Sequence, residues 1–375
     1  MFKAEELFQN ITDRNHPDET VLTIIQGKGT LPREQAGRNI HYDDASLSNY
    51  KKVEQGDFII HLRSFEGGLE MANEAGIVSP AYTILRCKRP HSSLFYDAYF
   101  HTDEFINHNL SKSVEGIRDG RQISYEAFKW LGIPYCEPTE QEKISTLFSA
   151  FNERIAKQRD LVESLKKYKR GVVRTLLSPK HCKLKNVEWT TAKIGNIGTF
   201  IKGAPLSKAD ISSDGTPFIL YGELYTTYNE VISKVVRKTQ ASVDKQYYSQ
   251  IGDVIIPSSG ETPEEISTAS CVMLPDIILA GDLNIYRCTQ VDGRIMSYIL
   301  NHVVNDRIAR VAQGKSIVHV QATEISKIEI TYPDLISQKK LIETFDAITA
   351  RIDQSMRELE LLQVHRKALL QQLFI

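Results

Sequence analysis

Two stretches of the chain repeat one pattern: residues 141–177 read QEKISTLFSAFNERIAKQRDLVESLKKYKRGVVRTLL, and residues 338–374 read QKKLIETFDAITARIDQSMRELELLQVHRKALLQQLF. They align without a gap at an offset of 338 − 141 = 197 residues. At this offset identical residues coincide: Lys143 with Lys340, Phe148 with Phe345, Ala150 with Ala347, Arg154-Ile155 with Arg351-Ile352, Leu165 with Leu362 and Leu176 with Leu373. A match of this length indicates an internal duplication.

Each copy also carries apolar residues at alternating spacings of three and four, which is typical of a helix that buries one stripe against another helix. Two long helices with matching stripes are expected to pair with each other. Neither copy contains Pro, and each helix is predicted to run about 35 residues, or roughly 50 Å. The stripe of the first copy is Ile144, Phe148, Phe151, Ile155, Val162, Leu165, Val172 and Leu176, and that of the second is Leu341, Phe345, Ile348, Ile352, Leu359, Leu362, Leu369 and Leu373.

Both stripes are interrupted by polar residues at the same places. Gln158 and Lys169 interrupt the first, and Ser355 and Arg366 interrupt the second. A long protein can contain two amphipathic helices by chance, but shared polar interruptions weigh against that interpretation. Polar residues in a helix seam can fix its register, and we expect that role here.

The segments before the two helices have a different texture. Short β-type runs alternate with glycine-rich turn signals and shorter helical stretches, such as the one from Ile295 to Arg310, which predicts a mainly antiparallel α+β fold. We therefore predict two globular modules, residues 1–135 and 181–332. Each is followed by a long helical segment, residues 136–180 and 333–375.

The two modules share a frame but differ in their loops. Gly-Asp precedes a buried strand at Gly56-Asp57 and at Gly252-Asp253, and Arg-Cys ends a later strand at Arg86-Cys87 and Arg287-Cys288. The loops that follow the first of these strands, residues 61–68 and 257–261, have little in common. This pattern is expected of two related modules that recognise different targets, although duplicated loops also drift without any change of function.

Composition limits the possible functions. The 375 residues carry a net charge of −1, so the composition as a whole gives no nucleic-acid signature. There is no apolar run of about 18 residues or more, and the N-terminal residues lack the apolar core of a secretory signal. The five cysteines include no CxxC pair, which is typical of a reducing compartment. We therefore expect a soluble, cytoplasmic protein.

Signatures of catalysis and metal binding are missing from the sequence. It contains no GxGxxG, HExxH or GxSxG motif and no Asn-Pro-Pro-aromatic run of the kind used in adenine methylation. Gly314-Lys315-Ser316 looks like the end of a phosphate-binding loop, but Ala309 stands where the first glycine is required. We expect no catalytic residues, no metal site and no cofactor bound by this chain.

The whole chain resembles the specificity (S) subunits of type I restriction–modification systems. The resemblance is carried by two variable modules with matching helices, and by the junctions that lead into those helices. Residues 133–144 and 330–341 look like the junction motif of that family, and residues 189–203 resemble its usual module opening. The chain departs from the family pattern at Ser337, where Glu is usual, and in the first module, which lacks an opening tryptophan like Trp189.

The resemblance implies an architecture and a division of labour. The two helices would pack antiparallel, and two target-recognition domains related by an approximate two-fold axis would each read one half of a gapped site in double-stranded DNA. Two methyltransferase (M) subunits, which bind S-adenosylmethionine, would dock around the helices, and restriction (R) subunits would join for cleavage. Such a chain directs adenine methylation or cleavage and carries no catalytic site of its own.

Side chains that read bases are expected on loops, because such loops can enter a DNA groove. We expect candidates of this kind at Arg38, Arg63, Ser64, Arg118 and Arg121 in the first module, and at Lys202, Tyr221, Tyr225, Ser258, Ser259 and Lys315 in the second. Each of these residues can equally be an ordinary surface side chain, and so can the basic run 166–170, which we considered as a phosphate contact. The alternative function is a coiled-coil scaffold whose modules bind proteins or glycans, which suits the near-neutral charge.

Overall fold

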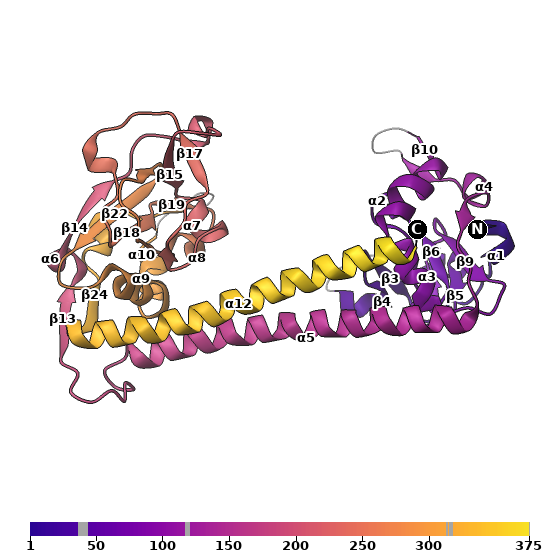
Figure 1. Ribbon diagram of the computed structural model, residues 1–375, viewed down its shortest axis with the longest axis horizontal. Helices are drawn as coiled ribbons and strands as arrows, with labels where there is room; N and C mark the ends of the chain where they lie inside the picture. The colour runs from indigo at the N-terminus through magenta and orange to yellow at the C-terminus, as the bar shows by residue number, and fades with distance from the viewer. Residues whose placement is uncertain (37–43, 117–120, 313, 315–317, 375) are drawn as a thin grey trace. The chain divides into compact units, whose positions relative to one another are not determined.

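The computed structural model describes residues 1–36, 44–116, 121–312, 314 and 318–374, and it divides into two compact units. Unit 1 comprises Met1–Asp160 and Ser355–Ile375, and unit 2 comprises Leu161–Gln354. There are two long helices, α5 (Pro138–Leu176) and α12 (Leu335–Leu373) (Figure 1). One part of each helix belongs to unit 1 and the other part to unit 2. The units therefore divide within the helices, because each globular module packs on the nearer part of both.

The two long helices are equal in length, at 39 residues each, and both of their ends differ by the repeat offset: 335 − 138 = 197 and 373 − 176 = 197. Pro138 begins α5, where a missing backbone N–H costs nothing. Asp334 precedes α12 and accepts hydrogen bonds of 3.0 Å from the backbone N–H groups of Ile336 and Ser337. The predicted pair of long helices is confirmed.

Unit 1 is built around a four-stranded antiparallel sheet in the order β2-β9-β6-β7. The helix α3 (Ser93–Phe100) supplies aromatic side chains to a core that also contains Phe8 and Phe58. The sheet strands are β2 (Phe8–Ile11), β6 (Phe58–Ile60), β7 (Glu70–Met71) and β9 (Thr83–Cys87). Shorter strands form four further pairs: β1 (Phe2–Lys3) with β12 (Gly132–Ile133), β3 (Leu22–Ile25) with β4 (Gly29–Pro32), β5 (Lys51–Val53) with β8 (Gly76–Val78), and β10 (Val114–Glu115) with β11 (Gln122–Ile123). The short α-helices are α1 (Ala4–Leu7), α2 (Ser64–Gly67) and α4 (Tyr125–Phe128).

Unit 2 contains a five-stranded sheet in the order β14-β22-β18-β20-β16 and a three-stranded sheet in the order β17-β15-β21. Their strands are β14 (Gly198–Lys202), β15 (Thr216–Leu220), β16 (Val231–Ile232), β17 (Arg237–Thr239), β18 (Asp253–Pro257), β20 (Ser270–Val272), β21 (Ile278–Ala280) and β22 (Leu283–Cys288). Two further pairs are β13 (Trp189–Lys193) with β24 (Glu329–Pro333), and β19 (Ser259–Gly260) with β23 (Val318–His319). The helices are α6 (Ile194–Ile197), α7 (Glu223–Thr226), α8 (Pro263–Ile266), α9 (Gly293–His302), α10 (Asn305–Val311) and α11 (Ala322–Ile325).

Most strand pairs in both units are antiparallel, so the predicted α+β class is confirmed. Two pairs in unit 2 are parallel, β15 with β21 and β16 with β20. The stretch expected to be helical from Ile295 to Arg310 is helical except for a short break. Its residues lie in two helices, α9 and α10, that are separated at Val303 and Val304.

The dipeptides repeated in the sequence meet in each unit. In unit 1, Arg86 in β9 donates hydrogen bonds of 2.8 and 2.7 Å to the carboxylate of Asp57, which precedes β6. In unit 2, Arg287 in β22 donates to Asp253 at the start of β18, with a shortest distance of 3.0 Å. Because both carboxylates are buried, each needs its arginine partner. The repeated Gly-Asp and Arg-Cys pairs are therefore structural parts of the shared frame.

Two equivalent glutamines attach each module to its own helix. In unit 1, the side chain of Gln141 accepts from the backbone N–H of Ser92 at 3.0 Å and donates to the carbonyl of Cys136 at 2.7 Å. In unit 2, Gln338 accepts from the N–H of Asp292 at 2.8 Å and donates to the carbonyl of Pro333 at 2.7 Å. Both glutamines are fully buried, so the junction between module and helix is a satisfied polar contact in each unit.

The structure places the predicted stripe residues in buried or half-buried positions, with one exception. Leu373 is 42% exposed, so its assignment to the stripe is corrected. Its neighbours Leu370 and Phe374 are turned inward instead, as are their counterparts Val173 and Leu177 in the other copy. A strict spacing of 3.5 residues drifts against the 3.6-residue turn of a helix, which moves the buried stripe by one position at this end.

Candidate nucleic-acid interface

Two of the predicted arginines in unit 1 lie close to one short helix. Arg63 is exposed and immediately precedes α2, and the Arg121 guanidinium lies 4.5 Å from the ring centroid of Phe65 in that helix. Ser64, by contrast, is fully buried, and its hydroxyl accepts a hydrogen bond of 2.9 Å from the backbone of His61. Ser64 shapes the turn, and its assignment as a DNA contact is corrected. Arg38 and Arg118 lie outside the described residues.

A buried carboxylate supports the neighbouring turn between β3 and β4. Glu70 accepts hydrogen bonds from the backbone N–H groups of Gly27 and Gly29 at 2.6 and 2.8 Å, and His101 lies 3.4 Å away. Burial alone would raise the pKa of Glu70, but these hydrogen bonds, with that of His101 the strongest, lower it overall. The result is a turn whose backbone is held by one ionised side chain from the sheet.

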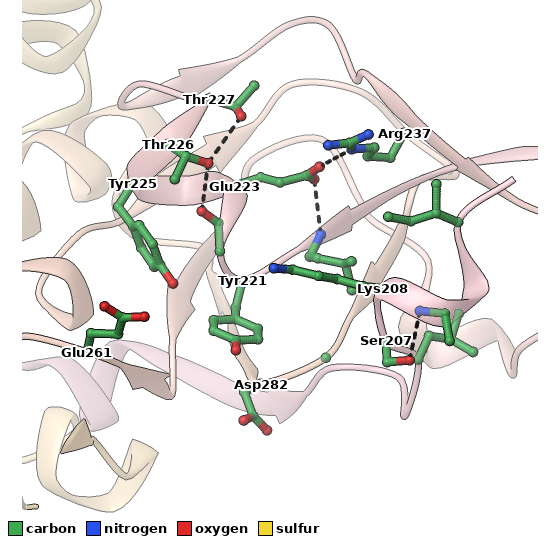
Figure 2. Close-up of a pocket in the computed structure, with 16 residues that line it drawn as sticks. Ser207, Lys208, Tyr221, Glu223, Tyr225, Thr226, Thr227, Arg237, Glu261 and Asp282 are labelled. Atoms are coloured by element: carbon green, nitrogen blue, oxygen red, sulfur yellow. Dashed lines mark hydrogen bonds and ion pairs between the residues drawn. The ribbon is translucent and has the colours of Figure 1, made fainter. Parts of the chain in front are cut away.

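Unit 2 contains a cleft of about 880 Å³ between the segment after β14 and the ends of β15 and β21. Figure 2 shows Tyr221 between Lys208 and Asp282, with Tyr225 and Glu261 on a neighbouring part of the wall. Tyr221 and Tyr225, both predicted DNA contacts, therefore lie in one site. The sequence reasoning missed Lys208, Glu261 and Asp282.

The walls of the cleft hold several of their polar groups in place. Glu223 is buried and pairs with Arg237 at 2.9 Å. Burial and the nearby carboxylates Glu265 and Glu261 raise the pKa of Tyr225, so its hydroxyl stays protonated and able to donate a hydrogen bond. The cleft thus offers hydroxyl donors, carboxylate acceptors and one exposed lysine on a largely fixed scaffold.

Of the other predicted contacts in unit 2, those that the structure describes do not line the cleft. Lys202 is exposed at the end of β14. Ser258 and Ser259 are buried, so their assignment as DNA contacts is corrected. They support the wall instead, because the Ser259 hydroxyl donates to the Asp282 carboxylate at 2.7 Å and the Ser258 N–H donates to the Asp282 carbonyl at 2.7 Å. Lys315 lies outside the described residues.

In both units, charged groups lie at the edge of the frame where the chain leaves β6 or β18. In unit 1 the chain runs directly from β6 to α2, which Arg63 precedes, whereas in unit 2 the short strand β19 stands between β18 and α8, and Glu261 lies between β19 and α8. The turn between β8 and β9 likewise corresponds to the turn between β21 and β22 that carries Asp282. The frame is kept while the chemistry of this edge differs, which is the arrangement expected of two recognition surfaces.

The basic run 166–170 on α5 contains one residue that is not available to DNA. Lys169 is buried in unit 2, where it lies 2.8 Å from Glu230, and Glu230 is also 2.7 Å from His302. Burial would raise the pKa of Glu230, but the hydrogen bond from His302 and the charge of Lys169 lower it to about 2. Lys169 is therefore a link between the helix and the module of unit 2.

Within the described parts of the chain, no group of three or more His, Cys, Asp or Glu side chains is placed to hold a metal ion. Among the helices of those same parts, none has both the length and the apolar character needed to cross a membrane.

Two modules on one frame, with different chemistry at the same edge and long helices attached through equivalent glutamines, define a duplicated recognition protein. Residues 186–363 match the family model described as the type I restriction modification DNA specificity domain. A specificity domain is a DNA-sequence recognition module and has no catalytic role. The predicted resemblance to specificity subunits is confirmed. No curated protein matches the sequence.

Three solved structures share the fold over the whole chain. One belongs to a study of complex assembly and conformational transition of the type I R-M system, with 14% identity, a TM-score of 0.62 and 96% of that chain covered. The type I restriction-modification S subunit from M. genitalium has 15% identity, a TM-score of 0.56 and 95% covered. The HsdS subunit from Thermoanaerobacter tengcongensis has 16% identity, a TM-score of 0.50 and 95% covered. All three cover 100% of the present chain.

Proposed function

We propose that the chain selects the DNA sequence for a type I restriction–modification complex, with each module reading one half of a gapped double-stranded site. The observation that carries this proposal is a kept frame whose loop after the equivalent strand differs in chemistry, with Arg63 after β6 in unit 1 and Glu261 after β18 in unit 2. Two copies with identical edges would recognise two equal half-sites, whereas differing edges recognise a site with two unlike halves.

The proposal includes the partners that the resemblance to specificity subunits implies. Methylation of adenine and cleavage are assigned to two methyltransferase subunits, which bind S-adenosylmethionine, and to restriction subunits. Exposed apolar residues on the long helices support the docking of such partners. In unit 1, Leu147, Leu361 and Val364 are 40%, 55% and 57% exposed, although the solvent-facing side of a helix pair is normally polar.

The boundaries of the modules are part of the same proposal. Segments 1–135 and 181–332 are the recognition domains, and 136–180 and 333–375 are the helical segments, which contain α5 and α12 with a few flanking residues. With a net charge of −1, the chain is expected to depend on its partners for much of the charge that neutralises DNA phosphates.

The experiment is a DNA-binding titration of the chain assembled with its methyltransferase partner, at several salt concentrations. A DNA-recognition subunit gives an affinity that falls steeply with salt and differs between DNA sequences. A scaffold that binds proteins or glycans gives an assembly whose DNA affinity is the same with and without the chain. That result would overturn the proposal.

A further inference from the structure

The cleft of unit 2 has a chemical character that restricts how DNA can use it. Two exposed carboxylates, Glu261 and Asp282, and two tyrosines, Tyr221 and Tyr225, line it together with Lys208 and the Glu223–Arg237 ion pair (Figure 2). Carboxylates are repelled by phosphate groups, so they do not serve as backbone contacts. On DNA their favourable partners are the exocyclic amino groups that cytosine and adenine display in the major groove.

Asp282 is the better placed of the two carboxylates. It is exposed in the turn between β21 and β22, where a side chain can enter a groove. Its carboxylate is oriented by the hydroxyl of the buried Ser259 at 2.7 Å, and its backbone carbonyl is held by Ser258. One carboxylate oxygen is thus engaged by the protein while the side chain remains open to solvent, as preorganised recognition requires.

The remaining groups of the cleft complete a reading surface. Lys208 is exposed in the segment after β14 and is suited to a phosphate on the same strand. The Tyr225 hydroxyl, whose pKa is raised above its ordinary value by burial and nearby carboxylates, lies near Glu261 (Figure 2). The cleft therefore holds a lysine suited to a phosphate, Lys208, and a carboxylate suited to an amino group, Asp282.

We propose that this cleft is the base-reading site of the second module and that Asp282 determines specificity by accepting a hydrogen bond from a cytosine or adenine amino group. The inference rests on the proposed function. It adds to that function the residue that reads a base, Asp282, and the chemical group that this residue recognises, an amino group in the major groove. Lys208 positions the DNA without selecting a base.

The test measures binding of the assembled complex to a panel of duplexes in which each base pair of the half-site is replaced in turn. The wild-type complex should discriminate at one cytosine or adenine by roughly 5- to 150-fold, the range of a good base contact. Asp282→Ala, which removes the acceptor, should lose this discrimination at that position alone. The matched control is Asp276→Ala, which removes another exposed carboxylate at the opposite end of β21. It should bind like the wild type.

Two further arms separate the possible outcomes. Replacing the critical adenine by purine, or the cytosine by its analogue without the amino group, should weaken binding by the wild-type complex but not by the Asp282→Ala complex. Lys208→Ala should weaken binding to all duplexes equally and reduce the salt dependence by about one phosphate.

An equal effect of Asp282→Ala on every duplex, or no effect, would overturn the inference while leaving the proposed function intact. If the Asp282→Ala variant does not assemble, the amino-group scan on the wild-type complex decides the question alone. Insensitivity to every such deletion overturns the inference. A wild-type complex with no sequence preference at all would instead overturn the proposed function.

Discussion

Gln158 and Ser355, which are 355 − 158 = 197 residues apart, are hydrogen-bonded to each other: the Gln158 side-chain amide donates to the Ser355 carbonyl at 2.9 Å. They are equivalent positions in the repeated helix, and both interrupt its apolar stripe. Asn152 and Arg366 also meet, at 2.6 Å, so the two helices run antiparallel within unit 1. A buried polar contact between equivalent positions favours one register over its neighbours.

The buried hydroxyl of Ser355 gives a first prediction. Among the described residues this hydroxyl has no hydrogen-bond partner, so Ser355→Ala should raise the free energy of unfolding by about 1 kcal/mol. Ser337→Ala on the same helix should lower it by about 1 kcal/mol, because its hydroxyl donates to Asp334 at 2.7 Å. Urea unfolding followed by helical circular dichroism compares the two. Equal signs for the two variants would contradict this reasoning.

A second prediction concerns acid stability. The pKa of Glu230 is lowered from 4.5 to about 2 in the folded protein, so its contribution is complete above pH 4.5 and is lost as the pH falls towards 2. That contribution is on the order of 3 kcal/mol. Unfolding measured between pH 6 and pH 2.5 should show a shallower acid loss in Glu230→Gln than in the wild type. Glu264→Gln, an exposed control, should follow the wild type.

The same cluster predicts the effect of removing its lysine. Lys169→Met should lower the free energy of unfolding at pH 7 by about 3 kcal/mol, since Glu230 then keeps a buried charge with one partner fewer. In the double variant with Glu230→Gln most of this loss should disappear. A double-mutant cycle measures the coupling between Lys169 and Glu230. If the losses of the two single variants add up in the double variant, the two side chains do not stabilise each other as their distance indicates.

The two equivalent glutamines allow a test that is specific to each unit. Gln141→Ala removes two buried hydrogen bonds and should speed amide exchange at Ser92 by roughly 30-fold, as expected for a loss of about 2 kcal/mol. Gln338→Ala should do the same at Asp292. Each variant should leave the amide of the other unit unchanged. Exchange that rises in both units with either variant would contradict independent junctions.

Arg63 gives a prediction on DNA affinity. If it contacts guanine with both of its terminal nitrogens, Arg63→Ala should weaken binding of the assembled complex to its cognate site by roughly 1–3 kcal/mol and relax selection at one position. Lys143→Ala, a surface change on α5, is the matched control. An equal loss on all DNA sequences would reassign Arg63 to a phosphate, and no loss would remove it from the interface.

Much of the architecture was predictable, because the repeat and the apolar periodicity are local signals. The spacing around Phe148 and Phe345 predicts two long helices, and both end where the offset requires. The burial of Ser64, Ser258 and Ser259 was not predictable, because it depends on contacts between segments far apart in sequence. Glu261 and Asp282 were not among the predicted contacts, because carboxylates are not an expected signal of DNA binding, and only the fold gathers them beside Tyr221 and Tyr225.

The paired motifs show the same division. The sequence displays Gly-Asp and Arg-Cys twice, which indicates a shared frame. It does not show that Asp57 and Arg86 bond to each other, since the strands that carry them become neighbours only in the folded sheet. The repeated dipeptides predict which parts of the two modules correspond. The order of the strands in the sheet explains why the two residues of each pair meet.

The central claim is that this chain selects the sequence that partner subunits methylate. It is tested most directly by modified-base sequencing of DNA from cells that express the chain with its methyltransferase partner, compared with cells that lack only the chain. The account predicts methylated adenine in a two-part gapped motif that disappears when the chain is absent. Methylation that is identical with and without the chain, with the partner shown to be active, would contradict it.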